Sequence, residues 1–206
     1  ITREMILVIQ GLVILFAGLN INTLFQECAT RAPTLIIENR NFVKRIVFPL
    51  ETLSWSTLGS ALFHLLISTI VLLAFSLVIR GYVPWTVVYF PIVVLVFMPF
   101  MAGLTWVLSS LGVFMRDLKH AMGIITVMMM FLAPIFYSKE MIPERYRQLL
   151  YLNPLTVIVE ASRDVLIWGH APNWLHLGAY TIAACLFAWL AFAWFEKTRK
   201  GFADVL

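Results

Sequence analysis

The stretch from Gly81 to Met115, GYVPWTVVYFPIVVLVFMPFMAGLTWVLSSLGVFM, contains no Asp, Glu, Lys or Arg in 35 residues. A helix that crosses a bilayer needs about 20 predominantly apolar residues, so this stretch is long enough to span a membrane. It is continuously apolar, whereas the strands of a membrane barrel alternate polar and apolar positions. The stretch therefore predicts a transmembrane helix, bent where Pro91 and Pro99 interrupt it.

Four other windows without charged residues repeat this pattern, so that all charged residues fall in 71 of the 206 positions. None of the windows has a polar face that could meet water, which argues against five buried helices of a soluble protein. No acidic residue lies within any predicted span. We predict an all-α, polytopic transmembrane bundle that forms a single domain over residues 1–206. Its five spans are expected at about 5–26, 56–79, 86–115, 121–137 and 175–195.

The overall composition excludes several other classes of protein. Apolar residues make up 61% of the chain and charged residues 13%, against about 25% charged in soluble domains. The net charge of +4 is too small and too scattered for a nucleic-acid-binding surface. Aromatic residues at 14% exclude intrinsic disorder. Cys28 and Cys185 are expected at different membrane depths, so we expect no disulfide between them.

Basic residues between the spans predict the orientation. With five spans, residues 27–51, 116–119 and 196–206 fall on one side and carry nine Lys or Arg, and the other side carries six. The positive-inside rule places the first set in the cytoplasm. The N-terminus would then lie outside, and a further span before Ile1 would return it to the cytoplasm. We therefore expect six spans in the full protein.

Two polar segments carry amphipathic patterns. In residues 38–48, Phe42, Val43 and Ile46 share one face, basic and amide side chains share the other, and Pro49 ends the helix. This segment is either a solvated loop whose basic residues touch lipid headgroups or a docking helix for a cytoplasmic partner.

Residues 138–169 predict a hairpin of two short helices at the membrane surface or dipping into it. Pro143 starts the first helix, which would run to about Tyr151, and Asn153 with Pro154 caps and starts the second. Gly169 fits the position just after the second helix. An apolar stripe at helical spacing runs along that second helix through Leu155, Ile158, Val159, Ser162 and Leu166.

Residues that could carry chemistry are few. The chain has no Gly-rich phosphate loop, no His-Glu-x-x-His and no Gly-x-Ser-x-Gly. His64 is the only histidine of its span, and His120, His170 and His176 lie near span ends, so we expect no metal site and no catalytic residue in this chain. Aromatic side chains such as Trp106 are either lipid-facing, part of the core, or a wall on which sugar rings stack.

Six short motifs in a fixed order resemble one family, and they extend over nearly the whole chain. The sequence is similar to the permease subunit of bacterial ABC exporters of polysaccharides, which serve O-antigen, capsule and teichoic acid. It departs from the family at Asn20-Ile21, where a Pro-Trp pair is frequent. The motifs are Ala17-Gly18-Leu19, Asn41-Phe42-Val43-Lys44-Arg45-Ile46-Val47-Phe48-Pro49, Met115-Arg116-Asp117, Ala133-Pro134-Ile135-Phe136-Tyr137, Asn153-Pro154-Leu155 and Gly201-Phe202-Ala203-Asp204.

The resemblance implies an architecture and a set of partners. Two copies of the permease would pair around a channel in the bacterial inner membrane, two separate ABC ATPase subunits would bind below, and a lipid-linked polysaccharide would move outward. ATP and magnesium would be bound by the ATPase, so this chain would hold no cofactor. An N-terminal interface helix and a first span would precede Ile1. An ABC permease for a drug or lipid, and less plausibly a membrane-embedded transferase, are the alternatives.

The resemblance also implies roles for individual residues. Segment 39–48 would be the coupling helix moved by the ATPases, and segment 138–169 the external gate. The charges of the hairpin's second helix would either form a local surface network or hold the gate shut across the dimer axis. The coupling residues are Arg40, Asn41, Phe42, Lys44 and Arg45; the gate residues are Tyr137, Tyr151, Glu160, Arg163 and Asp164; the channel-lining aromatic residues are Trp106, Phe131 and Phe136.

Overall fold

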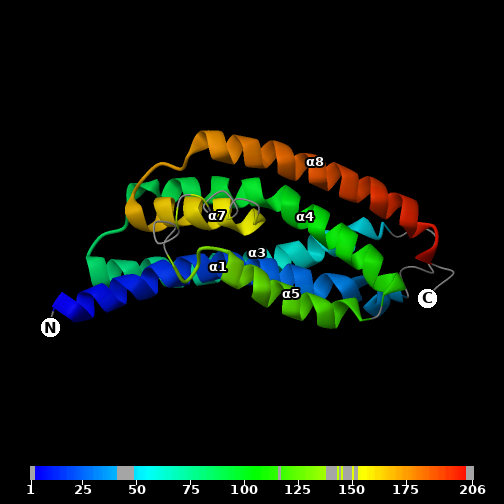
Figure 1. Cartoon of the computed structure of the whole chain (residues 1–206), viewed down its shortest axis with the longest axis horizontal. Helices are drawn as coiled ribbons and strands as arrows, with labels where there is room; N and C mark the ends of the chain where they lie inside the picture. Colours follow the sequence, from blue (N-terminus) through cyan, green and yellow to red (C-terminus); the bar gives the residue numbers. More distant parts are fainter. Residues whose placement is uncertain are drawn as a thin grey trace.

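The computed structural model describes residues 3–40, 49–115, 117–137, 143, 145, 150 and 153–202, and side chains from residue 11 onward. These residues form helices and connecting turns, with no strand among them, as predicted (Figure 1). The elements in chain order are α1 (Arg3–Glu38), α3 (Glu51–Arg80), the 3₁₀ helix η1 (Trp85–Tyr89), α4 (Phe90–Phe114), α5 (Leu118–Leu132), α7 (Pro154–Arg163), the π helix η3 (Asp164–Trp168) and α8 (Trp174–Arg199).

Four of these helical segments are long and apolar enough to cross a membrane: 11–38 in α1, α3, the combined η1 and α4, and α8. The remaining predicted span, 121–137, corresponds to a shorter apolar helix, α5, with 15 residues. It ends at Leu132 because Ala133 adopts an extended backbone, the conformation that a following proline favours. The chain is a multi-pass membrane protein, and the count of five spans stays a prediction.

Helix α1 extends much further than the sequence predicts. The expected span ended at Gln26, and Glu27 was expected to open a polar segment. The helix instead continues to Glu38, with Pro33 inside it. It continues because Cys28, Ala29, Ala32 and Ile36 recur at helical spacing and are all buried. The prediction that no acidic residue lies in a span is therefore wrong, because this membrane-length helix contains Glu27.

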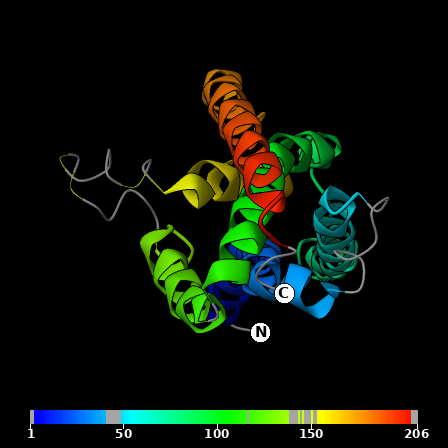
Figure 2. The ribbon, with the colours of Figure 1, turned by 90° about the vertical axis from the view of Figure 1, so that its right-hand side faces the viewer.

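Helix α1 lies at the centre of the bundle. It packs against α3, α4, α5 and α7, and α8 packs on the far side of α4. Figure 2 shows α5 and α3 on opposite sides of α1. Helices α1 and α4 approach closely where Gly112 meets Pro33, because a Cβ added at Gly112 would lie 1.9 Å from the Pro33 carbonyl oxygen. Only glycine fits this crossing.

The connections gather at two ends of the bundle. One end, called here the basic end, holds the end of α1, the start of α3, the α4–α5 turn and the end of α8 (Figure 1). The opposite end, called the hairpin end, holds the α3–η1 turn and the η3–α8 turn (Figure 1). This grouping agrees with the predicted alternation, in which residues 27–51, 116–119 and 196–206 share one side.

Candidate functional site

The second helix of the predicted hairpin forms as its sequence indicates. The Asn153 side chain accepts a hydrogen bond from the Leu155 N–H at 3.0 Å, and Pro154 occupies the first turn. Gly169 ends the helical segment with φ of 70°, a left-handed conformation that glycine adopts without strain. The predicted cap, start and end of this helix are confirmed. Of the first helix, only Pro143, Arg145 and Leu150 are among the described residues.

Helix α7 lies inside the bundle and not on its surface. The five residues of the predicted stripe are all buried, and so are most of the other residues of the helix. It packs against α1 and α4 in the half of the bundle nearest the hairpin end (Figure 1). Residues on nearly every face of α7 are apolar or small, which fits this buried position; whether the helix lies at the membrane surface or dips into it stays a prediction.

Arg163 anchors α7 to two other parts of the chain. Its side chain is 8% exposed. Its Nη1 donates to the Pro134 carbonyl, its Nη2 donates to the Ile135 carbonyl at 2.5 Å, and its Nε donates to the Ile14 carbonyl at 3.3 Å. The backbone just after α5 is irregular, so the Pro134 and Ile135 carbonyls lack helical partners, and the guanidinium satisfies them. Gly18 leaves room for it, since an added Cβ there would lie 3.1 Å from Nη2.

The other predicted gate residues lie around this anchor. The Tyr137 hydroxyl donates to the Leu132 carbonyl at 3.1 Å and the Phe131 carbonyl at 3.3 Å, at the end of α5. Glu160 and Asp164 are partly buried on α7 and η3. Tyr151 lies outside the described residues. These contacts are all within one chain, and the role of the gate residues across a dimer axis stays a prediction.

The three predicted channel-lining aromatic residues lie in two different places. Phe131 and Phe136 are exposed and stack with ring centroids 5.5 Å apart. Trp106 is buried in α4, with its ring 6.0 Å from Trp55 of α3 and 5.0 Å from Phe192 of α8. Trp106 thus packs as a core residue of the single chain, whereas the stacked Phe131 and Phe136 rings are exposed. Their predicted role in lining a channel stays a prediction.

The π helix η3 is fastened to the α3–η1 turn at the hairpin end. Arg80 Nη1 donates to the Ile167 carbonyl at 2.9 Å, and the Thr86 hydroxyl donates to the Val165 carbonyl at 2.7 Å. Helices of the π type are rare in proteins, and those that occur are often found at functional sites. Side-chain donors from α3 and η1 therefore hold the π helix in place at the hairpin end.

The predicted coupling segment joins the ends of α1 and α3 at the basic end. Arg40 is exposed just after α1. The remaining coupling residues, Asn41, Phe42, Lys44 and Arg45, lie outside the described residues.

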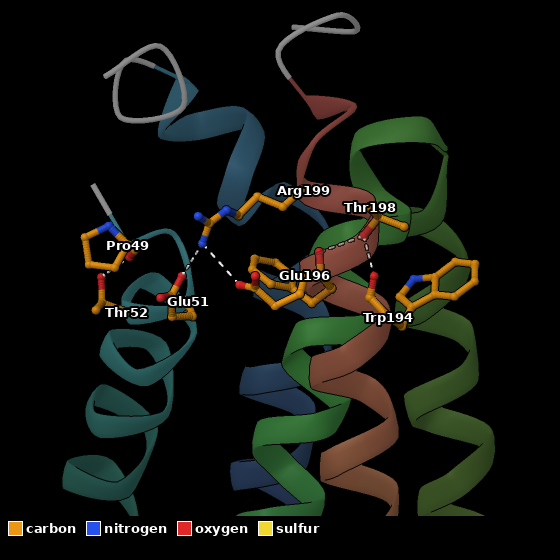
Figure 3. A network of polar contacts seen from close by, with 8 residues as sticks. Pro49, Glu51, Thr52, Trp194, Glu196, Thr198 and Arg199 are labelled. Carbon is orange, nitrogen blue, oxygen red and sulfur yellow. Dashed lines mark hydrogen bonds and ion pairs between the residues drawn. The ribbon is translucent and has the colours of Figure 1, made fainter. Parts of the chain in front are cut away.

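Next to this segment, a polar network ties the start of α3 to the end of α8. Arg199 Nη1 lies 3.1 Å from Glu51 Oε2 and 3.1 Å from Glu196 Oε1 (Figure 3). The Thr198 hydroxyl donates to the Trp194 carbonyl and lies 2.7 Å from the Ser110 hydroxyl of α4. The charges of this network are part-exposed, so they hold the helix ends together without being removed from water.

The structure brings together three polar residues that the sequence did not single out as a site. His64 of α3 was expected to be alone in its span, but its Nδ1 lies 2.9 Å from both carboxylate oxygens of Glu27 on α1. Arg31 Nη2, one turn along α1, lies 2.9 Å from Glu27 Oε1. The i, i+4 spacing of Glu27 and Arg31 was the available signal, and it was missed because α1 was ended too early. Among the described residues, no three His, Cys, Asp or Glu side chains are placed to hold a metal ion.

The four membrane-length helices define a multi-pass membrane protein. The sequence model of the family described as "ABC-2 type transporter" matches residues 3–167, and the chain belongs to that family. The predicted resemblance to a permease of polysaccharide exporters is confirmed by curated relatives.

These relatives are bacterial and carry one name. The chain is 25% identical over 192 residues to the O-antigen export system permease protein RfbA of Myxococcus xanthus, covering 92% of this chain and 74% of that protein. It is 27% identical over 184 residues to a protein of the same name from Klebsiella pneumoniae, covering 88% and 70%. A second Klebsiella pneumoniae protein of that name is 26% identical over 187 residues, with the same coverage.

Proposed function

We propose that this chain is the membrane-spanning permease subunit of an ATP-driven exporter that moves a polysaccharide or a lipid-linked glycan outward across the bacterial inner membrane. The observation that carries the proposal is the match to proteins named as O-antigen export permeases over about nine-tenths of the chain. The family match over residues 3–167 and the four membrane-length helices support the same class.

The proposal includes partners. One chain has few helices for enclosing a wide glycan path, so we place two copies side by side, with two ABC ATPase subunits at the basic end that bind ATP and magnesium. The basic end suits this contact because it carries the excess of basic residues and one end of each of the four membrane-length helices. Segment 39–48 would receive the movement of the ATPase, because it connects α1, the central helix, to α3.

Deletion and complementation test the transport activity. The full-length protein is deleted in its own host, and the glycan on the cell surface and the glycan retained inside are measured. We expect retained lipid-linked glycan and a loss of surface glycan, restored by the wild-type protein only when its ATPase is active. Unchanged surface glycan, together with a change in drug or lipid efflux, would favour the alternative class of ABC permease and contradict the proposal.

A paired charge reversal tests the coupling segment. Lys44→Glu with Arg45→Glu should abolish export while the permease still reaches the membrane, because it reverses the charge of the surface offered to the ATPase. The matched control is Arg145→Glu with Arg147→Glu in the hairpin, which leaves the basic end unchanged. Normal export and normal complex assembly in the first double variant would remove the coupling role of this segment.

Cysteine labelling tests the orientation. In intact cells, a membrane-impermeant thiol reagent should label Arg147→Cys in the hairpin and leave Leu118→Cys, at the start of α5, unlabelled. Labelling at position 118 but not at 147 would reverse the proposed orientation.

A further inference from the structure

The exposed face of α1 changes character along its length. In the half nearest the hairpin end, this face carries Leu12 and Phe16, which with α3 residues line an apolar pocket of about 330 Å³. Between residues 23 and 34, the same face carries polar side chains. We call this set the polar stripe; it consists of Thr23, Gln26, Glu27, Thr30, Arg31 and Thr34.

The polar stripe runs between α5 and α3. Gln26 contacts Met130 of α5, with Nε2 3.9 Å from the sulfur, and Glu27 contacts His64 of α3. Figure 2 shows the same arrangement, with α1 between these two helices. Helices α3 and α5 each pack against α1 and at most weakly against each other, so the stripe lies between them; we call this place the gap.

The centre of this gap lies deep in the membrane. At 1.5 Å per residue, His64 is about 20 Å along α3 from Glu51 and about 24 Å from Arg80. It is therefore near the middle of a segment, 52–79, that contains no charged residue. Glu27 is at the same depth because it contacts His64. Ionisable groups at this depth are costly in lipid, so they face protein or water.

Two of the three ionisable groups are open to the gap. The Glu27 side chain is 11% exposed, whereas the side chains of Arg31 and His64 are each 53% exposed. The Glu27 carboxylate is hydrogen-bonded to Nδ1 of His64 and forms an ion pair with one guanidinium nitrogen of Arg31. Within the described part of the chain, the ring's Nε2 and the other guanidinium nitrogens have no hydrogen-bond partner. Nδ1 donates to the Glu27 carboxylate, so Nε2 of a neutral ring is an acceptor, and the unpaired guanidinium N–H groups of Arg31 are donors.

The chemistry of the stripe fits a neutral, hydroxyl-rich ligand. A single carboxylate lies between a guanidinium and an imidazole, so the acid and base charges are balanced inside the cluster. The threonine hydroxyls of positions 23, 30 and 34 donate to carbonyls of their own helix and keep lone pairs for accepting. Phe63, an exposed residue, has its ring centroid 6.4 Å from the His64 ring, which adds an apolar face beside the polar groups.

We propose that the polar stripe with His64 is a contact site for the hydroxyl groups of a neutral sugar chain inside a water-filled path. This inference rests on the proposed export of a glycan. It assigns the path to the gap between α5 and α3, and it assigns the recognising groups to Arg31, His64 and the stripe threonines, with Glu27 positioning the first two.

Accessibility to water is the first part of the test. In a Cys28→Ala, Cys185→Ala background, the assembled transporter in inverted membrane vesicles is treated with a membrane-impermeant thiol reagent. We expect rapid labelling of Arg31→Cys and no labelling of Ile70→Cys, which is 54% exposed on the apolar face of α3. Equal lack of labelling at both positions would show that the stripe is covered by lipid or by another helix, including a second copy, and would overturn the proposal.

Measurements of glycan export by variants form the second part of the test. Glu27→Gln, Arg31→Gln and His64→Gln should each lower glycan export at least tenfold in cells, with complex assembly unchanged. Glu38→Gln on the same helix and His170→Gln in the η3–α8 turn are the matched controls, and both side chains are exposed.

Normal export by Arg31→Gln and His64→Gln would overturn the site and leave the proposed function intact. A wild-type complex that moves no glycan would overturn the proposed function instead, and the labelling would still report whether the stripe is wet.

Discussion

Arg163 near the hairpin end and Arg199 at the basic end each join distant parts of the chain, but their surroundings differ. Arg163 is buried and donates to three backbone carbonyls, on α1 and just after α5. Arg199 is 40% exposed and lies between two carboxylates, on α3 and α8. Burial removes the alternative of hydrogen bonding to water, so the same side chain should matter much more in the first place than in the second.

The largest effect is expected from Arg163→Ala. The Pro134 and Ile135 carbonyls would lose their donor, and the Ile14 carbonyl within α1 would lose an additional one, which lowers the free energy of unfolding by on the order of 3 kcal/mol or more. Thermal unfolding in detergent, followed by tryptophan fluorescence, measures the change. Arg163→Lys should fall in between, because an ammonium cannot reproduce the planar fork of the guanidinium. Arg145→Ala, an exposed residue of the hairpin, is the control; an equal loss there would show that burial is not the cause.

Gly112→Ala tests whether the basic end is held by backbone packing and not by its charges. The added Cβ would meet the Pro33 carbonyl at 1.9 Å, so α1 and α4 would have to separate, at a cost of about 1–3 kcal/mol. Gly123→Ala in α5 is the control, since no atom lies within 4 Å of its added Cβ. That substitution should stabilise the helix by up to about 1 kcal/mol. A Gly112→Ala protein as stable as the wild type would contradict the close crossing.

Asn153→Ala should have a smaller effect, about 1 kcal/mol or slightly more. It removes the cap on Leu155 and the 3.1 Å hydrogen bond from Asn153 Nδ2 to the Met129 carbonyl of α5. Asn173→Ala, at the exposed cap of α8, gives a matched comparison with the same chemistry. We expect thermal unfolding to show a smaller loss there, because water can replace an exposed cap. A larger loss of stability for Asn173→Ala than for Asn153→Ala would show that α7 does not depend on its cap.

The smallest effect is expected from Arg199→Ala, within about 1 kcal/mol, because its ion pairs are part-exposed and screened. The difference from wild type should shrink further when unfolding is measured at 1 M salt instead of 0.05 M. A loss as large as that of Arg163→Ala, unaffected by salt, would remove the distinction between the two arginines.

Sequence patterns predicted the apolar helices well because the membrane imposes one simple rule, a long segment without charges. The spans of α3, α4 and α8 follow it closely. The boundary of α1 was missed because Glu27 and Arg31 look like the start of a loop in the sequence. Only the fold shows that His64 of α3 lies opposite Glu27 and is hydrogen-bonded to its carboxylate.

The candidate site was predictable in part. Local signals around α7 sufficed, because an asparagine cap, a proline start and a terminal glycine act over a few residues. The burial of Arg163 could not be predicted, because its three partners lie at positions 14, 134 and 135. Sequence alone therefore suggested a surface charge where the fold places an internal anchor.

The wide turn of η3 has a consequence for how the chain tolerates changes in length. A π turn holds one residue more than an α turn, so it is equivalent to a single-residue insertion in a helix. Deleting one residue within 164–168 would leave an ordinary turn, with the flanking residues still in place. The same deletion within α7 would rotate the following residues by about 100° and bring the buried stripe out of alignment. Among homologous sequences, gaps of one residue should therefore concentrate at η3 and be rare in α7.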